Sequence, residues 1–270
     1  MCIVGLARIV AVLFGPMDGK ERMESTMKTI KIEVTSDIVV RKVQQMGGDE
    51  MVVAAAKVSI SGEAALEFAK SESAQANVGL INFLMSHRHG TPFEHSAVTF
   101  FVHAPIFVWR EWHRHRIGFS YNEESARYKQ LDPVFWLPRR DRNLVPTSVH
   151  TSARPNFGPA SDEQYEWLVN DLVEGYQYEY NRYNRRIEMG YAKEVARAGL
   201  PFGIYSSCWV TCNPRSLMAF LSLRVHDPTA KFVSYPQAEI QQAALVAEQI
   251  FAEGWPLTYQ AFVKNGRVGP

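Results

Sequence analysis

The twenty residues from Trp109 to Tyr128 read WREWHRHRIGFSYNEESARY, and they include four arginines, two histidines and three glutamates among aromatic residues. An arginine side chain grips phosphate or carboxylate through a planar fork of donors and stays charged at any working pH. Neighbouring arginines repel one another by about a kcal/mol or more per close pair, unless an anion lies between them. The stretch therefore needs compensating negative charge.

Two explanations fit this need. One is a solvated basic helix face whose arginines pair with the nearby glutamates. The apolar frame from Ile106 to Tyr121 argues for the other, because it indicates a partly buried segment, and buried charges need partners. We therefore expect the stretch to bind an anionic small molecule, or a nucleotide with its phosphates.

The elements around this stretch predict an α/β fold. Residues 97–102 are β-branched and aromatic, which predicts a strand. Pro105 then opens a helix that ends at Gly118, and residues 119–127 form a loop. Hydrophobic spacing predicts the other elements: strands at 30–34 and 205–212, and helices at 49–59, 77–86, 163–189, 192–200, 213–224 and 237–252.

Composition limits the class of protein. With 270 residues the chain has a core that needs no disulfides. Its formal charge is 29 − 28 = +1, so the arginines are a local concentration, whereas a nucleic-acid-binding domain usually carries a basic surplus throughout. We expect no nucleic-acid partner. The three cysteines form no disulfide framework, which fits a reducing cytoplasm.

The N-terminus differs from the rest of the chain. Residues 3–14 are mostly apolar, too short to span a bilayer and without a basic region before them. Residues 27–34 read like an ordinary protein start followed by a strand. We therefore expect residues 1–26 to be a disordered or non-essential leader, residues 27–270 to be a single catalytic domain, and no membrane partner.

Several catalytic classes are disfavoured. The chain has no Gly-rich phosphate loop, no GxSxG elbow and no HExxH helix. Cys208 and Cys212 fall in an apolar strand, which does not suit a nucleophile. The three histidines of residues 87–95 favour hydrogen bonding to a ligand over a metal, so no metal site is predicted. An anion-binding site remains, built from arginines on four separate segments: Arg114, Arg116, Arg127, Arg197, Arg215 and Arg224.

The motif around these arginines resembles a known family. Arg114-His115-Arg116 is followed after eight residues by Ser125, and the pattern resembles the signature of the flavin-dependent thymidylate synthases (ThyX). Other motifs of that family occur in the same order, namely HGTPFEH at 89–95, APIFV at 104–108, EVAR at 194–197 and NPRSLM at 213–218 with Leu223-Arg224. The resemblance covers about residues 27–263.

The resemblance implies a fold and a set of site residues. The fold is a mixed α/β domain with an antiparallel or mixed sheet flanked by long helices, assembled as a homotetramer with sites at subunit interfaces. Carried over by position, FAD would contact Ser59, His89, Thr91, Arg114, His115, Arg116, Glu123, Asn213 and Arg215. The nucleotide would contact Glu111, Arg114, Glu123, Glu124, Ser125, Ala126, Arg127, Arg197 and Arg224.

The resemblance also implies a reaction. dUMP would be methylated to dTMP with 5,10-methylenetetrahydrofolate as carbon donor and NADPH as reductant, without a protein nucleophile. Arg224 would be the catalytic residue, at the pyrimidine carbonyls, where it would favour an ionised N3. Two positions depart from the family, Ala219 near the flavin and Gly199 after Arg197. The small Gly199 suggests room for a ribose 2′-hydroxyl, and so the alternative that UMP, or both nucleotides, is methylated in a nucleoside-antibiotic pathway.

Overall fold

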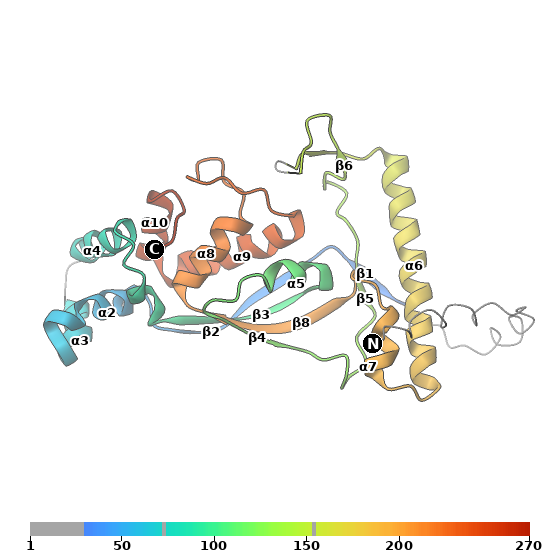
Figure 1. Cartoon of the computed structure of the whole chain (residues 1–270), viewed down its shortest axis with the longest axis horizontal. Helices are drawn as coiled ribbons and strands as arrows, with labels where there is room; N and C mark the ends of the chain where they lie inside the picture. The colour runs from blue at the N-terminus through green and yellow to red at the C-terminus, as the bar shows by residue number, and fades with distance from the viewer. Residues whose placement is uncertain (1–29, 72–73, 153–154) are drawn as a thin grey trace, which may run out of the picture. The chain divides into compact units, whose positions relative to one another are not determined.

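A four-stranded antiparallel sheet is the centre of the computed structural model, which describes residues 30–71, 74–152 and 155–270 (Figure 1). The strand order is β2-β3-β8-β4. The two middle strands pair from Val98 opposite Cys212 to Pro105 opposite Tyr205. The strands are β2 (Val39–Met46), β3 (Ala97–Pro105), β8 (Tyr205–Cys212) and β4 (Phe119–Glu123).

Three helices cover one face of this sheet. They are α5 (Ile106–Trp112), α8 (Pro214–Arg224) and α9 (Ala238–Gly254) (Figure 1). Alternate strand residues such as Phe100 and Val210 are fully buried beneath them, as the period of two in a strand requires. The opposite face is more open and carries Trp209, whose surface is 53% exposed.

The long helix α6 packs at the end of the sheet away from α8 (Figure 1). Ser161 and Gln164 close a capping box at its start, and its buried face is a row of tyrosines. Tyr176 stacks on Phe135 of a small parallel pair of strands. The elements of this end are α6 (Asp162–Glu188), α7 (Lys193–Ala196), η4 (Arg197–Gly199), β1 (Glu33–Thr35), β5 (Val134–Trp136), β6 (Val145–Pro146) and β7 (Phe157–Gly158).

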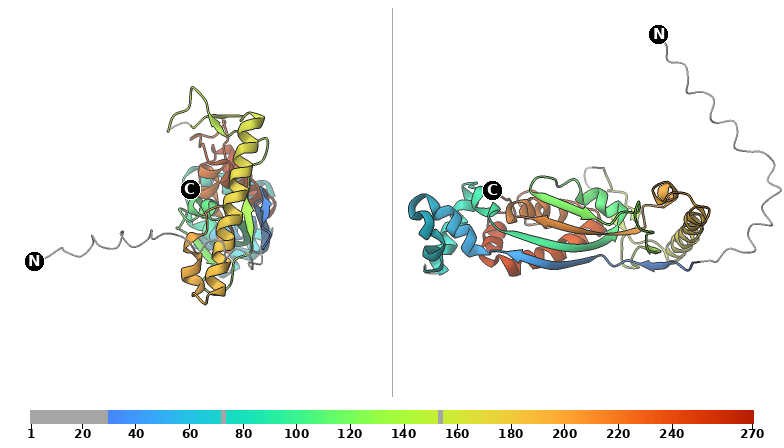
Figure 2. Two further views of the ribbon diagram at one scale, coloured as in Figure 1. Left: turned by 90° about the vertical axis from the view of Figure 1, so that its right-hand side faces the viewer. Right: turned by 90° about the horizontal axis from the view of Figure 1, so that it is seen from below.

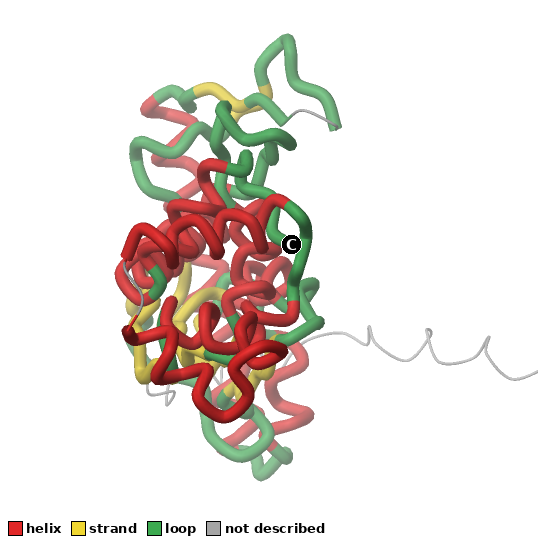
Figure 3. Tube along the Cα trace, turned by 90° about the vertical axis from the view of Figure 1, so that its left-hand side faces the viewer, coloured by secondary structure: helices red, strands yellow, loops and turns green. Residues whose placement is uncertain are grey.

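A group of helices lies at the other end of the sheet (Figures 2 and 3). Thr258 begins the buried side of the last of them and has no exposed surface. The group consists of α2 (Asp49–Ser61), η2 (Gly62–Ala64), α3 (Ala65–Ser71), α4 (Ala74–Ser86), η3 (Thr91–Glu94) and α10 (Pro256–Lys264).

Most predicted elements are confirmed, and the mixed α/β class with them. The prediction of a loop at 119–127 is wrong for its first half, because Phe119–Glu123 pairs with β8. The helix predicted to reach Gly118 ends at Trp112 instead. The Tyr121 hydroxyl donates to the carbonyl oxygens of Trp112 (3.2 Å) and His115 (2.6 Å), and so holds the chain in a turn there. The strands β2, β5, β6 and β7 and the helix α10 were not predicted. The leader predicted at residues 1–26 lies outside the described residues.

Asp49 links α2, the first helix of this group, to α10, the last one. Its carboxylate accepts hydrogen bonds from the Leu257 amide (2.7 Å), the Thr258 amide (2.9 Å) and the Thr258 hydroxyl (2.6 Å). These are the first amides of α10, which have no partner inside their own helix. A residue at the start of α2 therefore caps a helix that begins more than two hundred residues later.

We predict that Asp49→Ala lowers the free energy of unfolding by about 3 kcal/mol, because it leaves buried donors without an acceptor. Urea denaturation monitored by circular dichroism measures this change. Asp141→Ala, which removes an exposed carboxylate paired with Arg139, should leave the midpoint unchanged. Equal losses in the two variants would contradict the capping role.

Candidate active site

Arg224, the last residue of α8, is fixed by two residues of the arginine-rich stretch. Its Nη1 donates to Glu111 Oε2 (2.7 Å) and its Nη2 to the Glu111 carbonyl oxygen (3.1 Å). Its Nε donates to Nε2 of His115 (3.0 Å). The side chain is only 16% exposed, so its charge needs this carboxylate. The guanidinium is held in one orientation and keeps further N–H donors for a ligand.

His115 is the uncharged member of this cluster. Burial, and after it the neighbouring Arg224 cation, lower the pKa of His115 to about 4. The imidazole is therefore neutral at physiological pH, and its Nε2 accepts from Arg224. Its ring lies edge-on against Phe220 (5.0 Å between centroids), while Trp112 stacks on the same phenyl ring. Apolar packing thus positions a polar ring.

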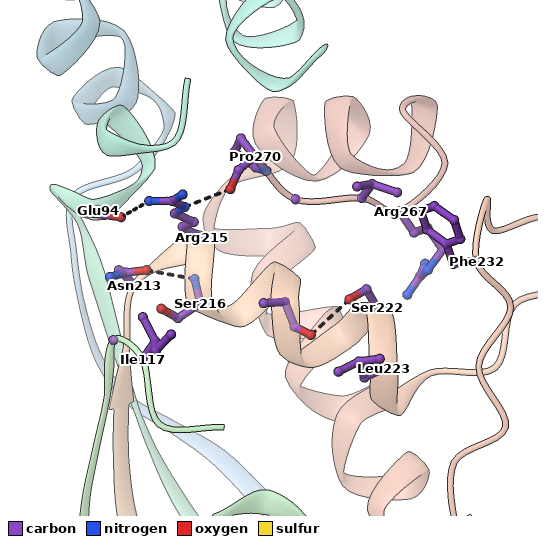
Figure 4. Close-up of a pocket in the computed structure, with 14 residues that line it drawn as sticks. Glu94, Ile117, Asn213, Arg215, Ser216, Ser222, Leu223, Phe232, Arg267 and Pro270 are labelled. Carbon is purple, nitrogen blue, oxygen red and sulfur yellow. Dashed lines mark hydrogen bonds and ion pairs between the residues drawn. The ribbon is translucent and has the colours of Figure 1, made fainter. Parts of the chain in front are cut away.

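A cavity of about 700 Å³ lies along α8, from Asn213 to Leu223 (Figure 4). Asn213 is the N-cap of this helix and accepts from the Ser216 amide (2.9 Å). Arg215 donates to Glu94 Oε1 (2.6 Å) and to the main-chain oxygen of Pro270 (2.8 Å). The lining consists of Glu94, Ile117, Gly118, Asn213, Arg215, Ser216, Ala219, Ser222, Leu223, Phe232, Arg267, Val268, Gly269 and Pro270.

Gly118 allows the arginine-rich loop to reach this cavity. Its φ of 69° lies in the left-handed region. A side chain at this position would overlap the hydroxyl of Ser216. The loop therefore runs from His115, in the cluster with Arg224, to Ile117 and Gly118, in the cavity wall.

The predicted phosphate-binding residues lie beyond the other end of β4. Arg127 donates through Nε to Glu194 (2.8 Å), which belongs to α7, and its own amide donates to the Ser125 hydroxyl (3.3 Å). Glu123 accepts from the Ser206 hydroxyl (2.6 Å) and Glu124 from the Ser207 amide (2.7 Å). The neighbouring Ala126 is buried, and Arg197 is exposed in η4.

One chain does not bring these two groups together. Strand β4 has five residues and rises about 3.4 Å per residue, so it separates the groups by roughly 15 Å. Figure 1 shows α8 and α7 near opposite ends of the sheet. Of the predicted site residues, the structure places Glu111, His115 and Arg224 together, and Asn213 and Arg215 in the cavity.

The other predicted residues lie around the cavity or apart from it. Arg114 and Arg116 flank His115 and are exposed. His89 and Thr91 flank Gly90, whose missing side chain makes room for the guanidinium of Arg215. Ser59 is exposed in the last turn of α2, and the described lining of the cavity does not include it.

Some residues of the site were absent from the prediction. Glu94 lies within the HGTPFEH motif, so its place in that motif was an available signal. Pro270 and Arg267 had no local signal, because their contacts with the site arise only in the fold. Among the described residues, no group of three or more potential ligands could hold a metal ion. No described helix is long and apolar enough to cross a membrane.

Comparison with known proteins agrees with the motifs. The family profile described as thymidylate synthase complementing protein matches residues 42–257. The chain belongs to this family. That confirms the family predicted from the Arg-His-Arg motif, and with it an enzyme of the methyltransferase type.

Two curated members of the thymidylate synthase complementing family show how far the similarity extends. The chain is 47% identical over 243 residues to the flavin-dependent thymidylate synthase of Streptomyces coelicolor, covering 89% of this chain and 96% of the relative. It is 45% identical over 237 residues to that of Tropheryma whipplei (strain TW08/27), covering 87% and 96%.

The fold matches two crystal structures of the UMP/dUMP methylase PolB from Streptomyces cacaoi. The complex with 5-Br dUMP gives a TM-score of 0.81 at 41% identity, covering 88% of this chain and all of that one. The complex with 5-Br UMP gives a TM-score of 0.79 at 40% identity, covering 88% and 99%. The mixed α/β architecture of this family is thus present here.

We predict that the imidazole of His115 does not titrate between pH 8 and pH 5 and takes up a proton only near pH 4. The unfolded chain binds this proton near pH 6.5, so the folded state loses stability as the pH falls between these two values. Arg224→Met should raise the pKa of His115 while leaving it below 6.5, because burial is the larger cause. NMR titration of the histidine ring resonances measures both, and a pKa near 6.5 in the wild-type protein would refute the assignment.

Proposed function

We propose that this protein catalyses the FAD-dependent reductive methylation of a uracil nucleotide at C5, converting dUMP to dTMP. 5,10-Methylenetetrahydrofolate would donate the carbon and NADPH the reducing equivalents. The observation that carries the proposal is the pre-oriented Arg224, held by Glu111 and His115, in a family member 47% identical to a flavin-dependent thymidylate synthase. The site would lie in the cytoplasm.

The cavity beside α8 suits a flavin. Its size of about 700 Å³ is in the range of small-molecule sites, which combine apolar walls with a few fixed polar groups. Asn213 and Arg215 supply those polar groups, and Leu223 and Phe232 are part of the apolar wall. Bound there, the flavin would supply the transfer of electrons. The residues Ser59, His89, Thr91, Arg114, Arg116 and Glu123 stay predicted contacts of the same cofactor.

Arg224 would act on the pyrimidine. Negative charge develops on the uracil ring when electrons are passed to it, and a fixed guanidinium beside the ring carbonyls stabilises that charge. One such preorganised donor typically contributes about 3–4 kcal/mol to the lowering of the barrier. Glu111 and the neutral His115 hold the guanidinium in place before the substrate arrives, so the reaction need not reorganise it.

A protein nucleophile is not needed in this proposal, and the described thiols do not offer one. Burial raises the pKa of Cys208 to about 12 and raises that of Cys212 as well. Both thiols are buried and therefore protonated at physiological pH, and the thiolate is the nucleophilic form.

UMP is the second candidate substrate. The methylase from Streptomyces cacaoi has been crystallised with analogues of both UMP and dUMP, which keeps both nucleotides in question for this chain. Gly199 does not leave an open space beside it in this chain. A side chain there would meet the Arg186 guanidinium (2.9 Å), so within the chain this space holds Arg186 and is not an opening for a 2′-hydroxyl. Turnover assays must therefore decide between the nucleotides.

Assembly would complete the site. Ser125 and Arg127, with Arg197, would bind the nucleotide phosphate, yet they lie roughly 15 Å of strand away from the Arg224 cluster. A second copy would bring its own phosphate-binding group to this chain's Arg224. The open sheet face carries Trp209, which is 53% exposed beside the polar Asn122 and Thr211, and an oligomer would bury this tryptophan. A homotetramer with sites at its interfaces accounts for both features.

We predict that Arg224→Ala reduces kcat by about 10²- to 10³-fold, because a preorganised donor to the developing charge is lost. Stopped-flow oxidation of the reduced flavin by nucleotide and folate measures the rate. The purified variant should stay yellow and folded, with a lower melting temperature than the wild type because Glu111 and His115 lose their partner. Activity within twofold of wild type would remove Arg224 from the mechanism.

A mixing experiment tests the divided site. We predict that Arg224→Ala and Arg127→Ala, each inactive alone, regain activity when mixed and exchanged, because mixed oligomers contain some sites with both arginines intact. Mixing Arg224→Ala with Arg224→Met is the matched control and should stay inactive. No recovery in either mixture, with subunit exchange verified, would place both arginines of a site on one chain.

The decisive experiment compares the two nucleotides. Reduced enzyme is mixed anaerobically with methylenetetrahydrofolate and either dUMP or UMP, and the nucleotide product is identified by mass spectrometry. We expect methylation of dUMP. Turnover of UMP as well selects the second candidate, and turnover of neither contradicts the proposed function.

A further inference from the structure

The C-terminal residues form one wall of the flavin cavity. Arg267, Val268, Gly269 and Pro270 line it, and we refer to these four as the C-terminal strap (Figure 4). The strap is tied to the loop that carries Phe232, because the Lys231 amide donates to the carbonyl oxygen of Gly266 (3.0 Å). A backbone hydrogen bond therefore joins two segments of the cavity wall, the one that leads into the strap and the one that carries Phe232.

Arg267 anchors the strap to the helical core. Its side chain is 6% exposed, and its Nη1 lies 2.6 Å from Glu248 Oε1 and 3.6 Å from Asp227 Oδ2. The guanidinium also lies over the ring of Phe262, at 5.3 Å. Glu248 is itself buried and accepts from the Tyr259 hydroxyl (3.1 Å). Breaking a buried pair of this kind is costly, because it leaves an uncompensated charge.

The backbone at this point is in an unusual conformation. Arg267 has a φ of 60°, directly after Gly266 with a φ of 72°. A left-handed conformation is uncommon for a bulky side chain and persists only where the surroundings hold it. The Arg267 amide donates to the Phe262 carbonyl oxygen (2.9 Å), so main chain and side chain both hold the turn. The strap consequently leaves α10 in a fixed direction.

The strap ends on Arg215. The main-chain oxygen of Pro270 accepts from Arg215 Nε (2.8 Å), and Glu94 accepts from Nη1 (2.6 Å). Gly90 leaves the space that this guanidinium fills. Two of the five N–H donors are used in this way, so three remain for a ligand. A side chain at Gly269 would lie 3.2 Å from Met218 Cβ, which shows how closely the strap packs on α8.

We propose that the C-terminal strap is a working part of the flavin site. Arg267 is a positioning residue: it fixes the strap, and through the main-chain oxygen of Pro270 the strap orients the free donors of Arg215 toward the flavin. The inference rests on the proposed function, because it takes a flavin to be the ligand of this cavity. Flavin binding would then also require the four strap residues, which do not belong to the Arg-His-Arg motif.

Two variants displace the strap by different routes. Arg267→Gln removes the anchor, and Gly269→Leu pushes the strap away from Met218. The matched control is Arg182→Gln, which makes the same change at an exposed pair with Glu179 on α6. FAD affinity is measured by fluorescence titration of the flavin-free protein, dUMP affinity by calorimetry at saturating FAD, and stability by thermal unfolding.

We expect both strap variants to bind FAD about 10-fold more weakly, with dUMP affinity unchanged and the control equal to wild type. Gly269→Leu should melt within a few degrees of wild type. Its FAD affinity therefore tests the role of the strap even if Arg267→Gln proves unstable. FAD affinity equal to wild type in a folded Gly269→Leu protein overturns the inference. A wild-type protein that binds no flavin is a different result, because it overturns the proposed function itself.

Discussion

A guanidinium largely withdrawn from water has to be compensated, and the compensation of Arg224 organises the site. Glu111 supplies the charge and His115 an uncharged acceptor. For both to reach Arg224, α5 must end at Trp112 and the chain must turn at once. The hydroxyl of Tyr121 holds that turn from the neighbouring strand. The end of α5, the loop that follows it and the edge strand β4 are therefore positioned around the charge of Arg224.

The same constraint explains why a histidine stands between two exposed arginines. The ring is packed against Phe220 and deprived of solvent, so it stays neutral beside a cation. The flanking side chains of Arg114 and Arg116 point to solvent and stay available. Neighbouring residues therefore differ in role: His115 packs in the interior, whereas Arg114 and Arg116 are exposed to solvent.

Short-range sequence patterns correctly predicted most helices and strands that carry the site residues. Asn213 followed by Pro214 marks a helix start in the sequence, and the structure has α8 there with Asn213 as its cap. The edge strand at Phe119–Glu123 was predicted as a loop, because it is only five residues long and follows directly after Gly118, and because its pairing with β8 is distant in sequence. Contacts such as that of Arg215 with Pro270 depend on the whole fold. The single chain does not bring all the predicted arginines together, and in our proposal a second copy would supply the missing ones.

The capping of α10 by Asp49 has a consequence for how the protein forms. The hydrogen bond between Asp49 and Thr258 joins residues that are 209 positions apart. Strand β3 pairs with β8, which follows it by more than a hundred residues. Pairings this remote must close long loops before they stabilise anything, which slows folding. On the ribosome, the N-terminal helices emerge long before their partners have been synthesised. Their apolar faces need shielding during that interval, so the chain should acquire its native core only after translation is nearly complete.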